Sequence, residues 1–426
     1  MGNQTGQIQT PRSMAKFFII FTGQAFSLFG SRLVQFALVW WLTRTSGSAS
    51  VLAFASIMAI LPQVFIGPFA GTFVDRWSRR NIMIVADGLI ALLIVILAVL
   101  YATGTAQIWH IYVVMFLRSM GGAFHWPAMQ ATTSLMVPEK HLSRIAGLNQ
   151  SLQGLANIVA PPMGALLLEF LPIESILFID VGTAMLAIAP LFFTPIPQPP
   201  RLETQVRSWL TVLTDMREGA RFIWDWKGLR MIMAISMTIN LLVNPAFALL
   251  PILVTEHFGG GALELAWLQS ANGLGMILGG LTLGVWGGFK RHVVTAFLAV
   301  IISGFCVTVV GLTPAALFLL AVGGMFGFAF MNAIANGTFF AFIQAIVPPE
   351  IQGRVFTLLI SLSMGMTPLG LAIAGPVANL LGERIWFLIG GITFVVMGVS
   401  AFFIPSIMQI EDRDSKDITS SETTVR

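Results

Sequence analysis

Long apolar segments, separated by short polar connections, follow one another along almost the whole of this chain. A helix that crosses a membrane needs about 20 mainly apolar residues. Lipid offers no hydrogen-bond partners to the backbone, so apolar segments of this length are expected to be helices. We therefore predict an all-α membrane protein with twelve transmembrane helices, at about 17–42, 49–73, 81–103, 108–135, 142–169, 173–195, 230–255, 263–287, 292–312, 314–346, 354–381 and 384–408.

The composition excludes a soluble globular protein. Only 10% of the residues are charged and 56% are hydrophobic, whereas a soluble domain carries about 25% charged residues. The polar residues 1–16 precede an apolar run of about 26 residues, which is too long for a signal-peptide core, so we interpret it as an uncleaved first helix. The single cysteine, Cys306, rules out an intrachain disulfide.

Several function classes lack their motifs. The chain has no Gly-x-x-x-x-Gly-Lys-Ser/Thr sequence for binding nucleotide phosphates, and no His-Glu-x-x-His or Gly-x-Ser-x-Gly motif. We therefore expect neither an ATP-driven pump nor an enzyme, and no bound cofactor or metal. The net charge of +4 comes from the connections between helices and gives no reason to expect a nucleic-acid partner.

The distribution of lysine and arginine predicts how the chain is oriented. With both termini in the cytoplasm, 19 of the 23 Lys and Arg residues fall on the cytoplasmic side, and the outer loops hold only Arg44 and Arg384. Cytoplasmic loops carry an excess of these residues. We therefore predict a multi-pass protein of the cell membrane with both termini inside the cell.

The chain repeats itself in two halves. Gly67 and Gly71 recur 213 residues later as Gly280 and Gly284, and Val-Pro-Glu at 137–139 has a counterpart at 347–350. A nearly constant offset indicates a duplicated six-helix unit. We predict an N-terminal half at 1–195, a cytoplasmic linker with an amphipathic helix at 196–229, a C-terminal half at 230–408, and a polar tail at 409–426. In the linker we expect residues such as Ala220, Ile223 and Trp224 to share the apolar side.

The connection between the second and third helices concentrates charge. Asp75 and three arginines occupy six residues there, which is too much charge for a buried loop and indicates a membrane face. Just before it, Gly67 and Gly71 are four residues apart, and this spacing predicts a close approach between two helices.

Polar side chains recur at helical spacing inside the apolar segments. Gln24, Ser27, Ser31 and Gln35 follow steps of three and four, so they share one face of the first helix. Similar stripes mark the fifth, seventh and tenth helices, with the candidates Asn149, Gln153, Asn157, Asn240, Asn244, Asn332 and Asn336. Such stripes either form hydrogen bonds between helices, each usually worth under about 1 kcal/mol, or line a cavity.

Five charged or titratable side chains lie within predicted helices. Arg32 and Arg118 each need water, an acid or a ligand, because a bare guanidinium in the bilayer is costly. Asp87 and Asp180 are the candidate counter-charges. Each carboxylate can form a static ion pair, or it can bind and release a proton during a working cycle; His125 can either titrate or act as a simple hydrogen-bond partner.

Three stretches resemble motifs of the major facilitator superfamily. Gly71, Asp75, Arg76, Arg79 and Arg80 match its Gly-x-x-x-Asp-Arg-x-x-Arg-Arg signature between helices two and three. The resemblance implies that this loop forms a cytoplasmic gate, with Asp75 approaching the start of helix eleven, whose free N–H groups attract anions.

The second and third stretches lie on helices four and five. The segment 117–122 looks like the helix-four motif, an arginine followed closely by glycine, which implies a role for Arg118 in proton coupling. The segment 160–164 is similar to the antiporter motif on helix five, although Ala160 stands where the motif has glycine.

The chain resembles macrolide-efflux-type drug antiporters of this superfamily over all twelve helices, with the resemblance concentrated in the first half. The residues that carry this resemblance include those at 23–31, 36–43, 75–80 and 148–152. It implies two six-helix halves around a central cavity, and export of a small lipophilic drug in exchange for protons by a monomer in contact with membrane lipid. Export of a siderophore or another secreted metabolite is the alternative on the same fold.

Overall fold

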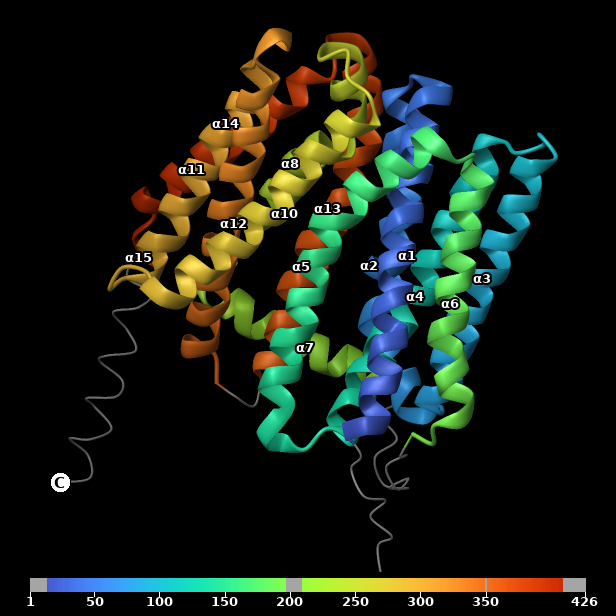
Figure 1. Cartoon of the computed structure of the whole chain (residues 1–426). Coiled ribbons are helices and arrows are strands. Elements are labelled where there is room, and N and C mark those ends of the chain that lie inside the picture. Colours follow the sequence, from blue (N-terminus) through green and yellow to red (C-terminus); the bar gives the residue numbers. More distant parts are fainter. Residues whose placement is uncertain (1–13, 197–208, 349–350, 409–426) are drawn as a thin grey trace, which may run out of the picture.

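The computed structural model describes residues 14–196, 209–348 and 351–408, and the described residues form helices joined by short turns, without a β-strand (Figure 1). The first six helices are α1 (Met14–Ser46), α2 (Ala49–Arg76), α3 (Arg79–Ala102), α4 (Ile108–Met136), α5 (Glu139–Phe170) and α6 (Ile173–Phe193). After α7 (Trp209–Asp225) come α8 (Lys227–Ala248), α9 (Leu250–Ile252), the π-helical turn η1 (Leu253–His257), α10 (Ala262–Trp286), α11 (His292–Leu312), the 3₁₀ turn η2 (Ala315–Leu317), α12 (Phe318–Ile346), α13 (Gln352–Leu381), α14 (Arg384–Phe403) and α15 (Pro405–Met408). The predicted all-α class is confirmed.

Ten helical segments in the described part of the chain are long and apolar enough to cross a membrane. α4 and α10 have comparable lengths but fall outside this criterion. α4 carries Arg118 and His125, and α10 contains many glycines. The ten spans support a multi-pass bundle, and the count of twelve remains a prediction.

The helices pack in two groups with the same pattern. In the first group, α1 contacts α5 and α6, α3 contacts α4 and α6, and α2 contacts α4. In the second, α8 contacts α13 and α14, α11 contacts α12 and α14, and α10 contacts α12. The groups meet through α2 against α13 and α5 against α10 (Figure 1). Each helix–helix contact in the first group has a counterpart in the second group, as expected from a duplicated unit.

Among the described residues, the buried apolar cluster that joins the two groups lies at one end of the bundle. At the end opposite α7, Phe36 and Trp40 of α1 belong to one buried cluster with Leu250 and Leu265 of the second group. Towards the α7 end, the first group has its own cluster around Phe17, and the second group has another that includes Ile223 of α7. The groups are therefore joined by side-chain packing at the far end and keep separate cores near α7.

The predicted helix 230–255 is interrupted. α8 ends at Ala248, and the chain continues through α9 and a π-helical turn that closes when Phe258 N–H donates to the Leu253 carbonyl at 3.2 Å. Pro245 and Pro251 lie on both sides of the break, and proline removes a backbone donor and disfavours the α conformation before it. Hydropathy continues unchanged across this point, which is why the apolar run alone predicted a single helix.

α7 buries one of its predicted apolar residues against the bundle and leaves two of them exposed. Side chains before Arg217 lie outside the described residues, but Ile223 is buried whereas Ala220 and Trp224 are exposed. The helix packs sideways on the start of α13, where a Cβ on Gly219 would lie 3.2 Å from the Arg354 carbonyl oxygen. One of the predicted apolar residues of this helix therefore packs on the bundle, and the shared apolar side of Ala220, Ile223 and Trp224 stays a prediction.

The glycines that make close helix contacts are not those that the repeat suggested. A Cβ on Gly67 or Gly280 would meet nothing within 4 Å, so the expected close approach at Gly67 is wrong. The side of α2 at Gly71 lies outside the described residues. The tight contact on α10 is instead at Gly279, where a Cβ would lie 2.2 Å from the Phe330 carbonyl oxygen.

Two adjacent glycines on α10 therefore provide a matched test of this packing. We expect Gly279→Ala to destabilise the protein by about 1–3 kcal/mol, because the added methyl group forces α10 away from the α12 backbone. Gly280→Ala has open space and should be neutral or slightly stabilising. Thermal unfolding of the two detergent-purified variants measures the difference, and equal midpoints would contradict the packing described here.

Candidate functional site

A cavity of about 910 Å³ lies between the two helix groups. Its wall comes mainly from α1, α5, α8, α12 and α13, with further residues from α9, α10 and α11. Seven of the polar residues singled out in the sequence lie in this wall: Arg32, Gln35, Asn157, Asn240, Asn244, Asn332 and Asn336. The shared core at the end opposite α7 closes the cavity on that side.

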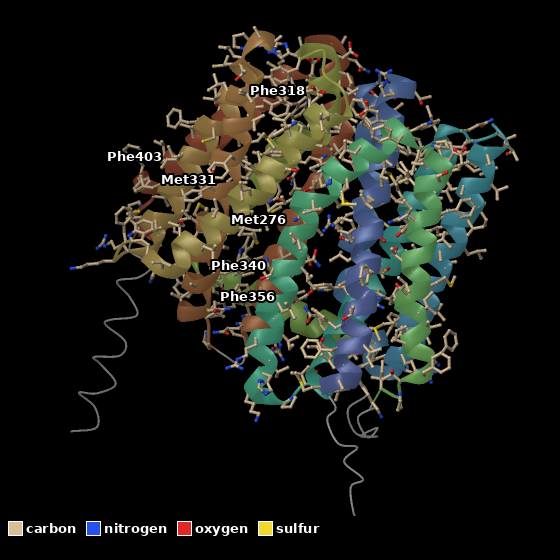
Figure 2. The ribbon with its side chains drawn as sticks, viewed as in Figure 1. Met276, Phe318, Met331, Phe340, Phe356 and Phe403 are labelled. Atoms are coloured by element: carbon tan, nitrogen blue, oxygen red, sulfur yellow. The ribbon has the colours of Figure 1, made fainter. Side chains whose placement is uncertain are left out.

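Much of the remaining wall is aromatic. Phe36 of α1 and Phe247 of α8 line the cavity, and Phe340 of α12 stacks on Phe356 of α13 with ring centroids 5.6 Å apart. Figure 2 shows these last two side chains close together near the α7 end of the second group. Aromatic rings offer large apolar contact areas of adaptable geometry, which suits a bulky lipophilic ligand.

The amides of the second group form short chains of hydrogen bonds along the wall. Asn244 Nδ2 donates to Thr367 Oγ1 at 2.7 Å and to Asn240 Oδ1 at 3.0 Å, and Asn240 Nδ2 donates to the Ser236 carbonyl. On α12, Asn336 Nδ2 donates to Asn332. These bonds fix the orientation of the amides while their remaining polar atoms stay available at the cavity.

Arg32 is the charged residue of the cavity wall. Its guanidinium Nη2 donates to Gln153 Oε1 of α5 over a long distance of 3.5 Å, and the side chain is exposed. Gln153, predicted as a cavity residue, therefore lies behind Arg32 and not in the wall itself.

Arg118 and Asp180 form a buried ion pair inside the first group. Arg118 Nη1 donates to Asp180 Oδ2 at 3.1 Å, and its Nη2 donates to the Ser31 carbonyl at 3.3 Å. Ser31 Oγ donates to the other oxygen of Asp180 at 3.2 Å. Gly30 leaves room for this network, because a Cβ there would lie 3.1 Å from Asp180 Oδ1. The pair therefore ties α1, α4 and α6 together.

Asp87 belongs to a second polar cluster, nearer the α7 end of the same group. Gln24 Nε2 of α1 donates to Asp87 Oδ2 at 3.0 Å, and His125 Nε2 of α4 lies 3.3 Å from Asp87 Oδ1. Asp87 is 7% exposed. The contact with His125 is an ion pair only when the imidazole is protonated.

The charged connection after α2 lies at the α7 end of the bundle. The side chains of Gly71, Asp75 and Arg76 lie outside the described residues. The predicted approach of Asp75 to the eleventh predicted helix, which is α13 in the structure, therefore stays a prediction. Arg80 donates to the carbonyls of Leu191 and Phe192 in the last turn of α6, where unpaired carbonyls favour a cation. Arg79 is buried, contrary to the expectation that this charge stays at the surface.

The sequence missed several residues of the site, and five of its cavity candidates lie outside the wall: Gln24, Ser27, Ser31, Asn149 and Gln153. Thr367 was overlooked, although Ser363 and Thr367 lie one turn apart on α13 and that spacing was visible. The phenylalanines of the wall carried no usable signal, because phenylalanine is also common on lipid-facing surfaces: Phe403, at 81% exposure, lies on the outside of the bundle (Figure 2).

Comparisons with known proteins agree with this arrangement. A family model described as the Major Facilitator Superfamily matches residues 20–370. Macrolide efflux protein A of Streptococcus pyogenes is 33% identical over 402 residues, which is 94% of this chain and 98% of that protein. Multidrug efflux pump Tap of Mycolicibacterium fortuitum is 27% identical over 396 residues, covering 90% of this chain and 94% of the pump.

Solved structures with similar folds are more distant in sequence. The nucleoside transporter NupG has a TM-score of 0.66 and 14% identity, with coverage of 91% of this chain and 98% of NupG. A POT family transporter in complex with 5-aminolevulinic acid has a TM-score of 0.70 and 11% identity, with coverage of 93% and 98%. At this identity the similarity concerns the fold alone.

Proposed function

The chain belongs to the Major Facilitator Superfamily and is a membrane transporter of the macrolide-efflux type, not an enzyme, and on this premise we propose that it exports lipophilic, macrolide-like compounds by proton antiport. The observation that carries the proposal is the central cavity, with its aromatic wall and hydrogen-bonding amides. Its volume of about 910 Å³ lies at the upper end of the range for small-molecule sites, roughly 300–1,000 Å³. The cavity is formed within one chain, which is consistent with a working monomer.

The Asp87–His125 pair is the proposed proton-binding group. Both oxygens of Asp180 accept hydrogen bonds, one of them from the permanent cation of Arg118, so this carboxylate is already engaged in a structural pair. Asp87 is contacted by a neutral amide and by an imidazole, which can gain or lose a proton. Proton uptake by this cluster changes the charge that is buried between α1, α3 and α4. Two conformations that surround the cluster differently therefore change in relative energy when the proton binds.

Alternating access is the proposed mechanism. The groups share a core opposite α7 and have separate cores near α7, so rocking of one rigid group against the other can exchange which end is closed. The excess of Lys and Arg at the α7 end favours an orientation in which this end of the bundle faces the cytoplasm. In this orientation the structure corresponds to a conformation that is closed towards the outside.

Drug accumulation in an efflux-deficient host tests the proposed function. Cells that express this chain should hold less of a labelled macrolide than cells without it, and a proton uncoupler should remove the difference. Depletion that persists with the uncoupler would contradict proton coupling. The absence of depletion for a panel of macrolides, with the protein present in the membrane, would contradict macrolide export and favour a narrow exporter of a secreted metabolite.

A further inference from the structure

The cavity wall carries one sign of charge. Among the described residues that line the cavity, Arg32 is the charged one, and none is an acid. The two buried acids described in the first group are engaged elsewhere: Asp180 with Arg118, and Asp87 with Gln24 and His125. A ligand in the cavity therefore meets a cation and neutral amides.

Arg32 is placed to bind a ligand. It lies near the middle of α1, which is long and apolar enough to span a membrane, and its side chain is exposed at the cavity. The hydrogen bond to Gln153, at 3.5 Å, is weak and occupies one nitrogen of a group that has five N–H donors. A guanidinium matches the geometry of a carboxylate through two parallel hydrogen bonds.

The surroundings of Arg32 suit the apolar part of the same ligand. Phe36 lies one helical turn further along α1 and also lines the cavity, and the stacked pair of Phe340 and Phe356 lies on the opposite group. A charge next to apolar walls is screened less than a charge in water, so Arg32 attracts anions and repels cations over the width of the cavity.

We propose that Arg32 binds an anionic or strongly accepting oxygen group of the transported compound, so that the cavity selects lipophilic acids and uncharged lipophiles over cations. On this proposal a compound with a basic amine enters the cavity as the free base. The inference rests on the proposed function, because Arg32 selects transported compounds only if the chain is a transporter. It concerns ligand binding, which is measured separately from transport.

Two probes of the same shape and opposite charge test the proposal. Pyrenebutyrate carries a carboxylate, and pyrenebutylamine carries an ammonium on a similar apolar body. Energy transfer from the tryptophans of the protein, reconstituted in neutral lipid nanodiscs, reports binding of either probe. We expect the protein to bind the acid at least tenfold more tightly than the amine, and Arg32→Gln to reduce this ratio to about one.

The controls separate charge, geometry and folding. Arg32→Lys keeps the charge and should retain part of the preference, whereas Arg44→Gln, at the end of α1 and outside the cavity wall, should leave the ratio unchanged. Gel filtration and thermal unfolding check that each variant is folded. If Arg32→Gln is unfolded, a preference for the acid that is smaller in Arg32→Lys than in Arg44→Gln supports the role of Arg32, and equal preferences in these two variants contradict it.

Equal affinity for the two probes, or an unchanged ratio in folded Arg32→Gln, would overturn the inference. This failure differs from failure of the proposed function. Uncoupler-sensitive macrolide export with no charge preference would leave the transporter function intact and remove only the role of Arg32. A charge preference without macrolide export would keep the role of Arg32 and point to a different lipophilic substrate.

Discussion

Asp180→Asn is expected to abolish transport and to lower the stability of the protein by about 3–5 kcal/mol. Asp180 is 3% exposed, and its side chain accepts hydrogen bonds from α4 and α1. The asparagine would leave the Arg118 guanidinium without its counter-charge in a buried position, and breaking a buried pair from one side costs about this much. The first helix group could then no longer move as one rigid body, which alternating access requires.

Paired variants separate the ion pair from the individual residues. Glu174→Gln, in the first turn of the same helix, should have little effect on stability or transport. The double variant Arg118→Gln with Asp180→Asn removes both charges and should recover most of the lost stability while remaining inactive. Thermal unfolding and vesicle transport measure both properties. Wild-type transport by Asp180→Asn would contradict the role assigned to this pair.

Asp87→Asn is expected to uncouple substrate transport from the proton gradient. The asparagine keeps the size of the side chain and its contact with Gln24 but cannot exchange a proton. Accumulation driven by a pH gradient should fall to the background level, whereas exchange of labelled for unlabelled substrate across the membrane, without a gradient, should continue. This pattern differs from the complete loss expected for Asp180→Asn.

The environment of Asp87 specifies the controls. α4 contributes His125 and α1 contributes the neutral Gln24, whereas Asp180 of α6 interacts with Asp87 through its charge and is itself paired with Arg118. His125→Gln should weaken gradient-driven accumulation, because the carboxylate would lose its imidazole partner. Gln24→Leu should reduce the rate but preserve the coupling. Gradient-driven accumulation by Asp87→Asn at the wild-type level would show that another group carries the proton.

The helices could be predicted from the sequence because each apolar run is long enough to require one. The breaks were harder. Pro245 and Pro251 are visible in the sequence, but many membrane helices tolerate proline, and α5 continues through Pro161 and Pro162. The hydropathy of a segment does not show whether a proline breaks the helix or is accommodated within it.

The polar residues of the site were identifiable, but their partners were not. Gln24, Ser31 and Gln35 share a face of α1 by spacing, yet Gln24 meets Asp87, Ser31 meets Asp180, and Gln35 faces the cavity. One helix face passes different neighbours at different depths in the bundle. The pairing of Arg118 with Asp180 joins residues 62 positions apart, and no local spacing fixes such a contact.

Transport by the purified protein in liposomes tests the central claim most directly. With only this chain in the membrane and an imposed pH gradient, a labelled macrolide should accumulate against its own concentration gradient, in the direction opposite to the protons. A protonophore should abolish the accumulation. Macrolide movement of the same rate with and without the pH gradient, or no movement by folded protein, would contradict the account of this chain as a proton-driven exporter.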